Sequence, residues 1–365
     1  MTLKKYLSQA GFIGINTVAV FAIIDIAATS MIKTRGFSQF FESSTEAGFI
    51  NKRNFNGIFG GPLNDFSTKV DINEFGTRKI PYNQCNPNEN PRDRLIFVGD
   101  SMTAGFEVND NQTYAAVFAG LNCKSLKVIN GGVRAHDTHM AIANAFRISR
   151  EMRPEENNTR SSIVYMATDN DFAENNNRTA YHTMKSKFGS FYDGKYYPPA
   201  KNNWENNTRM FVGDKMYFTT QAIVYFNIYK SYLQGRASTK NSISDDKCIR
   251  DSERALTIYK DTISREMEKE TGKRKGKHIF YIGVHPSTTN FELTEKMEGC
   301  ISQALRKKET FIHINLIPIH KFMREYNPSF VNNPSTRFRR DQHYSVFGHK
   351  HIANALNAIL MIIQN

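Results

Sequence analysis

Cysteine is scarce in this sequence, with only four among 365 residues: Cys85, Cys123, Cys248 and Cys300. No two of them form a CxxC pair, which argues against a zinc site or a thioredoxin-like redox site. An even number of cysteines in an exported chain allows two disulfides, but the sequence leaves their pairing open.

Motifs for nucleic-acid binding are also lacking, although the chain is basic. Lys and Arg number 48 against 35 Asp and Glu, a formal net charge of +13. This balance favours anionic partners such as lipid headgroups or acidic polysaccharide, and a Lys- and Asn-rich proteome bias explains it equally well. Because no zinc finger, RNP-like aromatic motif or basic helix array is present, we expect no nucleic-acid partner.

The N-terminus contains one long apolar run. Residues 11–31 read GFIGINTVAVFAIIDIAATSM, with Asp25 as the only charge, and about 20 apolar residues suffice to span a bilayer. Lys4 and Lys5 precede the run, which predicts a cytoplasmic segment 1–10, a single-pass anchor in the inner or plasma membrane, and an extracytoplasmic domain. A cleaved signal peptide, with the protein then secreted, is the alternative.

The rest of the chain alternates between strand and helix patterns. Five apolar runs predict strands, and amphipathic stretches between and after them predict helices. Such alternation is typical of an α/β domain with a parallel sheet covered on both faces, here over 91–365. The expected strands are 94–98, 126–130, 163–167, 278–284 and 311–316, and the expected helices 111–121, 138–150, 251–269, 293–306 and 346–363.

Two segments do not follow this alternation. Residues 32–90 are polar and lack sustained periodicity, so we expect a linker and a short lead-in to the domain. Residues 172–247 are rich in Phe and Tyr and interrupt the strand–helix order. A long insertion of this kind predicts a lid or binding segment, and a locally packed subdomain is a compatible alternative.

A serine at the end of the first expected strand is the candidate nucleophile. Ser101 follows Gly99 and Asp100, and a serine at a strand-to-helix turn exposes its hydroxyl and backbone N–H at the sheet edge. His343 could act as its general base, with Asp341 fixing the imidazole tautomer and stabilising the imidazolium. Taken alone, each residue is explained equally well by a turn, a helix cap or a surface position.

Two further strand ends could supply donors to a developing oxyanion. Gly132 follows the second strand, and glycine lets a backbone N–H come close to a ligand. Asn170 follows the third strand and could donate its side-chain amide, although an Asx-rich turn is the plain alternative. Because parallel strands end at one edge of a sheet, we expect these residues to converge with Ser101 in one crevice.

Taken together, these segments resemble the SGNH (GDSL-like) hydrolase family. Ser101 matches its nucleophile, Gly132 and Asn170 its oxyanion-hole residues, and His343 and Asp341 its base and the partner of that base. The resemblance implies a flavodoxin-like three-layer αβα fold and neither a metal nor an organic cofactor. It is carried by FVGDSMTAGF (97–106), VINGGV (128–133), TDNDF (168–172), DQHYSVFGH (341–349) and, upstream, by DINEFGTR (71–78), which is similar to a lead-in of many exported members.

Substrate contacts are less sharply indicated. Asp100, Arg134 and Asp171 adjoin the proposed site and are candidates, although a solvated side chain is the plain alternative for Arg134. His136 and His139 could line the crevice or simply pack. His349 and His351 share no helical face, which favours packing at a helix start over a metal site.

Three functions fit this sequence. The first is an esterase that cleaves carboxylic esters of a small molecule, a cell-envelope glycan or a lipid through an acyl-serine intermediate. The second is an O-acyltransferase that passes the same acyl group to a polysaccharide hydroxyl. The third is a catalytically inactive glycan-binding protein.

Overall fold

A computed structural model gives the fold of the chain. The residues it describes are 15–27, 37–60, 65–81, 93–122, 126–152, 160–168, 171, 182–192, 195–199, 208, 211–212, 219, 222–223, 244–270, 277–286, 291–307, 311, 313–330, 333–338 and 343–364.

A parallel five-stranded sheet forms the centre of the molecule, in the order β11-β10-β7-β5-β6. Alternate residues of each strand face opposite sides, so Leu95 and Phe97 of β5 join one apolar core while Ile96 and Val98 join the other. All five expected strands are present: β5 (Arg94–Gly99), β6 (Lys127–Asn130), β7 (Arg160–Ala167), β10 (Lys277–Val284) and β11 (Ile314–Leu316).

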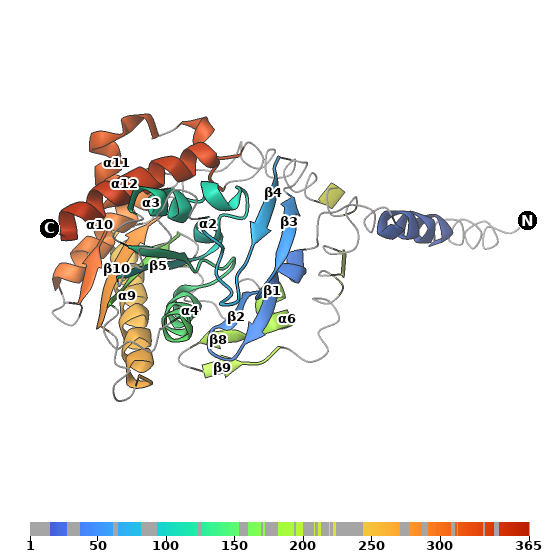
Figure 1. Ribbon diagram of the computed structural model, residues 1–365, viewed down its shortest axis with the longest axis horizontal. Coiled ribbons are helices and arrows are strands. Elements are labelled where there is room, and N and C mark those ends of the chain that lie inside the picture. Colours follow the sequence, from blue (N-terminus) through green and yellow to red (C-terminus); the bar gives the residue numbers. More distant parts are fainter. Residues whose placement is uncertain are drawn as a thin grey trace, which may run out of the picture.

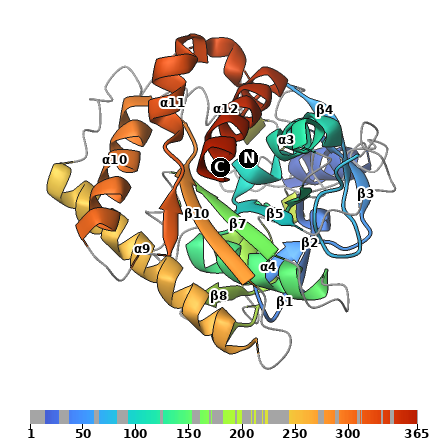
Figure 2. The same cartoon turned by 60° about the vertical axis from the view of Figure 1, so that its left-hand side comes forward.

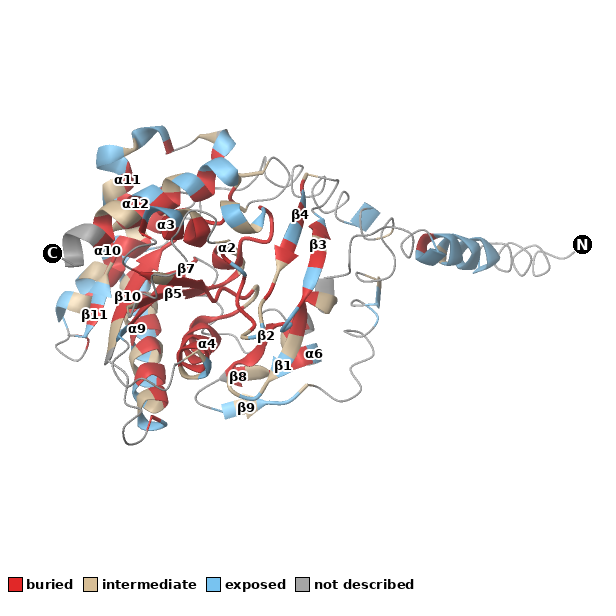
Figure 3. Cartoon of the chain, viewed as in Figure 1, coloured by how far each residue is buried: buried red, intermediate tan, exposed pale blue. Residues whose placement is uncertain are grey.

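Helices cover both faces of this sheet and make three layers, which confirms the predicted αβα arrangement (Figures 1 and 2). On one face lie α3 (Tyr114–Asn122), α11 (Ile319–Tyr326) and α12 (Val346–Gln364); on the other lie α4 (Thr138–Glu151), α9 (Asp245–Glu268) and most of α10 (Phe291–Lys307). Figure 3 shows the strands buried between these layers. The expected helix at 111–121 is a short 3₁₀ turn, Asp110–Gln112, followed by α3.

The segment predicted as linker and lead-in contains two antiparallel hairpins instead. They pair β1 (Phe41–Ser44) with β2 (Gly48–Asn51) and β3 (Asn56–Gly60) with β4 (Ser67–Asp71). Their strands are only four or five residues long, too short for a periodic signal in a polar sequence. Phenylalanines bury them against the loops of the αβα body, in a third core that includes Phe40, Phe49, Phe59 and Phe106.

Part of the aromatic insertion packs on these hairpins. Helix α6 (His182–Phe188) and the hairpin of β8 (Ser190–Tyr192) and β9 (Lys195–Tyr197) place Met184, Phe188 and Phe191 in the third core. These three side chains therefore belong to a core that is shared with the hairpins. Most of 172–247 lies outside the described residues, so the lid remains a prediction.

Residues 15–27 form a helix that lies apart from the αβα body in Figure 1. Its large apolar side chains are exposed, among them Ile15 and Val18. Asp25 is its one buried side chain and accepts hydrogen bonds from the backbone N–H and hydroxyl of Thr219. No helix in the described part of the chain is long and apolar enough to cross a membrane.

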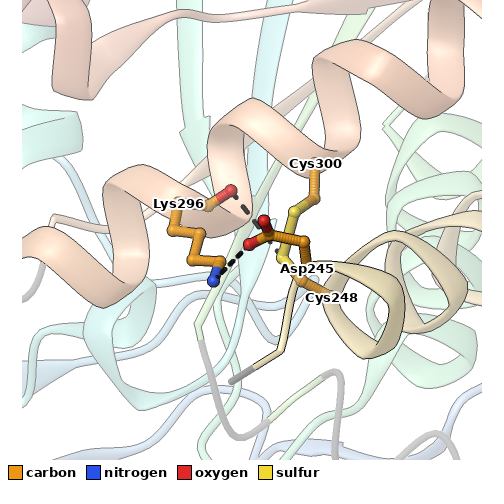
Figure 4. Close-up of a disulfide and its surroundings, with 4 residues drawn as sticks. All are labelled: Asp245, Cys248, Lys296 and Cys300. Atoms are coloured by element: carbon orange, nitrogen blue, oxygen red, sulfur yellow. Dashed lines mark hydrogen bonds and ion pairs between the residues drawn. A yellow bond between two sulfur atoms is a disulfide. The ribbon is translucent and has the colours of Figure 1, made fainter. Parts of the chain in front are cut away.

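A disulfide joins α9 to α10. Cys248 and Cys300 are paired with their Cα atoms 6.0 Å apart, across 52 positions of sequence (Figure 4). Lys296 and Asp245 form an ion pair of 2.5 Å beside the bond, but the Asp245 side chain is largely exposed, so the pair adds little. Cys85 and Cys123 lie outside the described residues.

We expect the disulfide to stabilise the domain. A chain-entropy estimate for a loop of this size is about 4 kcal/mol. Thermal unfolding should therefore begin at a clearly lower temperature in reductant than without it. The Cys248→Ser/Cys300→Ser double variant is the matched control, because reductant should no longer change its unfolding temperature. Equal unfolding temperatures for wild type and double variant would contradict the expectation.

Candidate active site

The candidate nucleophile lies on a one-turn helix at the carboxyl end of β5, the strand between β7 and β6. Helix α2 (Ser101–Ala104) begins after Asp100, whose Oδ1 accepts the Met102 N–H at 2.9 Å, and ends at Gly105 in the left-handed region. Gly99, just before the turn, has a φ of 154°. A Cβ there would lie 2.5 Å from both the Met166 carbonyl oxygen and Thr103 Oγ1, so the approach to Ser101 requires glycine.

Gly132 fixes α2 from the side of the neighbouring strand. A Cβ on Gly132 would lie 2.4 Å from the Ala104 nitrogen and 2.6 Å from the Thr103 carbonyl carbon. Only glycine lets the loop after β6 touch the backbone of α2, and this contact sets where Ser101 stands.

Ser101 and His343 meet across a sequence separation of 242 residues. His343 Nε2 lies 2.7 Å from Ser101 Oγ, within the range of a strong hydrogen bond. If the hydroxyl donates, Nε2 is the unprotonated nitrogen and Nδ1 carries the proton. The His343 side chain keeps 19% of its surface exposed, so the pair is open on one side.

The oxyanion-hole residues are only partly described. Asn170 and the predicted base partner Asp341 lie outside the described residues, and their roles stay predictions. The Gly132 N–H donates to Asn130 Oδ1 at 3.1 Å. An oxyanion at this position would have to share that N–H with the Asn130 amide.

A buried carboxylate that sequence reasoning missed lies on the far side of the imidazole. Glu107 Oε1 is 3.5 Å from His343 Nδ1, and the Glu107 side chain has no exposed surface. The same oxygen accepts from Arg134 Nη1. Glu107 follows Ser101 by only six positions, so its closeness to the nucleophile in sequence was the available signal.

Arg78 holds the loop that carries Glu107. Its fully buried guanidinium donates to the carbonyl oxygens of Ala104 (3.0 Å), Gly105 and Val108 (2.6 Å), and pairs with Asp110 at 2.7 Å. Burial lowers the pKa of Arg78 from its ordinary value, and Asp110 opposes that shift. Arg78 belongs to the predicted lead-in 71–78, which therefore has a definite structural role.

Two neutral histidines lie behind the nucleophile. His285 Nε2 is 3.3 Å from Thr103 Oγ1 and His349 Nδ1 accepts the Tyr114 N–H at 3.1 Å. Burial lowers the pKa of His285 to about 3 and that of His349 well below its ordinary value. His349 is therefore a packing residue at the start of α12, while His351 stands beside Asn327.

The other candidates are mostly structural. Asp171 is buried and its Oδ2 accepts from the Tyr165 hydroxyl and the Thr168 N–H, so this oxygen orders the end of β7. Asp100 is also buried, which raises the pKa of its carboxyl. His136 donates to the Phe49 carbonyl at 2.7 Å, and burial lowers its pKa to about 4.

Two other sequence candidates are held by contacts with neighbouring side chains. His139 is buried beside Thr262. Arg134 is half-buried, pairs with Glu107 and lies over the Phe59 ring at 5.2 Å, so it is not the solvated side chain that was the plain alternative. In the described part of the chain, no group of three or more His, Cys, Asp or Glu could hold a metal ion.

Comparison with known proteins gives structural similarity but no sequence relative. No family model and no curated protein matches the chain. A structure described as a lipolytic protein of the G-D-S-L family from Desulfitobacterium hafniense DCB-2 is similar at 10% identity, with a TM-score of 0.35, over 73% of this chain and 98% of that one. The lipase Lip_vut3 from a goat rumen metagenome is similar at 13% identity, with a TM-score of 0.35, over 73% and 96%. Similarity at this level carries no assignment of function, which has to come from the site itself.

The Gly132 contact generates a prediction. Gly132→Ala should lower kcat/KM by roughly tenfold or more, because its methyl group must displace α2 and with it Ser101. It should also destabilise the domain by about 1–3 kcal/mol, the usual cost of overpacking.

A matched control is Gly299→Ala on α10, where a Cβ meets nothing within 4 Å. That change should leave kcat/KM unaltered and raise stability by up to about 1 kcal/mol through helix propensity. Ester hydrolysis and urea unfolding measure both effects, and a fully active Gly132→Ala variant would contradict the role given to this contact.

Proposed function

We propose that this protein is a serine esterase that cleaves carboxylic esters through an acyl-serine intermediate. The observation that carries the proposal is the 2.7 Å contact between Ser101 Oγ and His343 Nε2 at the carboxyl edge of the sheet. A nucleophile within hydrogen-bond reach of a base, with a carboxylate beyond the base, is the arrangement that activates a serine hydroxyl.

The reaction begins when His343 Nε2 takes the hydroxyl proton as Ser101 Oγ attacks the ester carbonyl carbon. The resulting imidazolium gives this proton to the leaving alkoxide as the tetrahedral intermediate collapses to the acyl-serine. A water molecule then attacks the acyl group, His343 again accepts the proton, and the acid departs with Ser101 restored. In each cycle one ester and one water molecule are converted to an alcohol and an acid, and the enzyme is restored.

The oxyanion of each intermediate needs donors at its position. The Ser101 N–H at the start of α2 is one candidate, and the resemblance adds the Gly132 N–H and the Asn170 amide. Since the Gly132 N–H is already accepted by Asn130, we expect it to act as a shared, three-centre donor. The hydrogen bond to Asn130 would keep the Gly132 N–H oriented before substrate arrives.

The acyl acceptor defines the second candidate function. If the hydroxyl of a cell-envelope glycan replaces water, the same residues make an O-acyltransferase. The formal net charge of +13 supports an anionic glycan or lipid as the ester-bearing or acyl-accepting partner. The alternative of an inactive glycan-binding protein is disfavoured by the short contact of Ser101 with His343, which binding alone does not require.

We also propose that segment 11–31 attaches the protein to the inner or plasma membrane. Its helical part 15–27 exposes apolar side chains around its circumference, and a helix that is apolar all round needs an apolar environment. The disulfide supports an oxidising, extracytoplasmic compartment for the domain. A cleaved signal peptide remains the alternative.

Ser101→Ala should lower kcat for p-nitrophenyl acetate by about three orders of magnitude or more, because the nucleophile is lost. A fluorophosphonate probe should label wild type at Ser101 and leave the variant unlabelled. Ser302→Ala is the control with unchanged activity, because the Ser302 hydroxyl bonds only to Arg306 of the same helix, α10, among the contacts of the described residues. Retained turnover or labelling of Ser101→Ala would refute this nucleophile.

The same assay, run with an acyl donor in heavy-oxygen water and with a glycan added, distinguishes the two reactions. Hydrolysis places heavy oxygen in the released acid, whereas transfer adds an acyl mass to the glycan.

For the membrane proposal, the full-length protein should sediment with membranes and resist extraction at alkaline pH. Intact mass should include residues 11–31 if the segment is an anchor and should lack them if the segment is a cleaved signal peptide. Phe21→Lys should release the anchored form, because a charge in the bilayer core is costly. An intact chain found entirely in the soluble fraction would contradict the proposal.

A further inference from the structure

We propose that Glu107 is a positioning residue for the base: its carboxylate holds the Nδ1–H of His343 and stabilises the imidazolium, while Arg134 limits that effect. The inference rests on the proposed function, since it assigns a role to the Ser101–His343 pair. It deepens that function by placing the orienting charge on the loop just after the nucleophile.

The geometry puts Glu107 on the correct nitrogen. Ser101 Oγ lies 2.7 Å from His343 Nε2, and Glu107 Oε1 lies 3.5 Å from the other ring nitrogen, Nδ1. This distance is an ion-pair contact slightly longer than a hydrogen bond. Such contacts are often long before substrate binds and shorten when charge develops on the imidazole.

Burial makes this carboxylate effective. The Glu107 side chain has no exposed surface, and its Oε2 has no hydrogen-bond partner among the described residues. A buried carboxylate with an unfilled oxygen is poorly compensated, so it gains from a cation formed beside it. The His343 imidazolium is such a cation, and it exists only while the reaction proceeds.

The protein fixes both neighbours of the carboxylate. Arg78 binds the carbonyl oxygens on either side of Glu107. Arg134 is presented by a turn in which Ala135 has a φ of 62°, a conformation that costs about 1 kcal/mol or more for a non-glycine residue. Ala135 shows that the turn is held in place by its surroundings.

Several charges face His343, and their signs determine the expected titration. Glu107 and Asp100 favour the imidazolium, whereas Arg134 and Arg78, two cations near Glu107, oppose it; buried His349 stays neutral. Asp341, two positions before His343, lies outside the described residues and is the rival orienting group. The proposal therefore requires separate tests of the two carboxylates.

Titration of His343 by NMR, with isotope-labelled histidine in the full chain, measures the effect without substrate. Glu107→Gln should move the titration midpoint of His343 down by roughly one to three pH units, because an opposite charge is lost. Arg134→Gln should move it up, because Glu107 loses its competing cation. A purely structural role would not give shifts of opposite sign.

Kinetics provide the second readout. The acid limb of kcat/KM should move in the same two directions, and Glu107→Gln should lower the high-pH plateau roughly tenfold or more. Glu151→Gln is the matched control. This glutamate also pairs with an arginine, Arg147, but it is the last residue of α4 and does not contact His343 in the described structure. Its profile should equal that of wild type.

Each outcome has one meaning. If Glu107→Gln leaves the His343 midpoint unchanged while Asp341→Asn lowers it, the inference is wrong and Asp341 is the orienting residue. If Ser101→Ala keeps esterase activity, the proposed function fails, yet the NMR midpoints still test the Glu107–His343 pair. Opposite shifts in Glu107→Gln and Arg134→Gln support the inference in either case.

Discussion

A single buried guanidinium connects the N-terminal hairpins to the site. Arg78 lies at the end of the segment that follows β4. It donates to the carbonyl oxygen of Ala104, the last residue of α2, and to those of Gly105 and Val108 in the loop that follows. Desolvating an arginine is expensive, and the cost is offset only because each of these oxygens and the Asp110 carboxylate accepts from it. The loop thus has one conformation, and with it Glu107 and the end of α2 have one position. This explains why the folded domain includes residues before β5, the first strand of the five-stranded sheet in chain order.

The aromatic core beneath the hairpins gives the same loop a second support. Phe106 stands beside Glu107 in sequence and contacts Phe40, Phe41 and Phe59. Phe59 also lies under the Arg134 guanidinium. The same ring therefore packs in the aromatic core and supports the Arg134–Glu107 ion pair. Packing of this kind resists small displacements, because rings in contact cannot shift singly without opening voids. The positions of the charged groups around His343 therefore depend on phenylalanines that carry no charge.

Three histidines near Ser101 differ in burial and in neighbouring charge, and so they differ in role. His285 and His349 are fully buried and kept neutral by desolvation, so they act as hydrogen-bond partners and ring-packing groups behind α2. His343 is partly open and faces a carboxylate, so of the three it is the one whose surroundings suit it to take the Ser101 hydroxyl proton in the proposed reaction. The same side chain serves structure or chemistry according to burial and neighbouring charge.

The sequence alone determined the α/β class, the five sheet strands and the pair of Ser101 and His343, because buried parallel strands are continuous apolar runs and their carboxyl ends must meet at one edge. It could not determine the hairpins of 37–71, whose strands are too short for a periodic signal, or the roles of Arg78 and Glu107. A glutamate in a polar loop has the same local sequence whether it is solvated or buried. Only the tertiary structure decided this, because burial and the 3.5 Å approach to His343 depend on chain segments far apart in sequence. The Cys248–Cys300 pairing was decided in the same way, by the packing of α9 on α10.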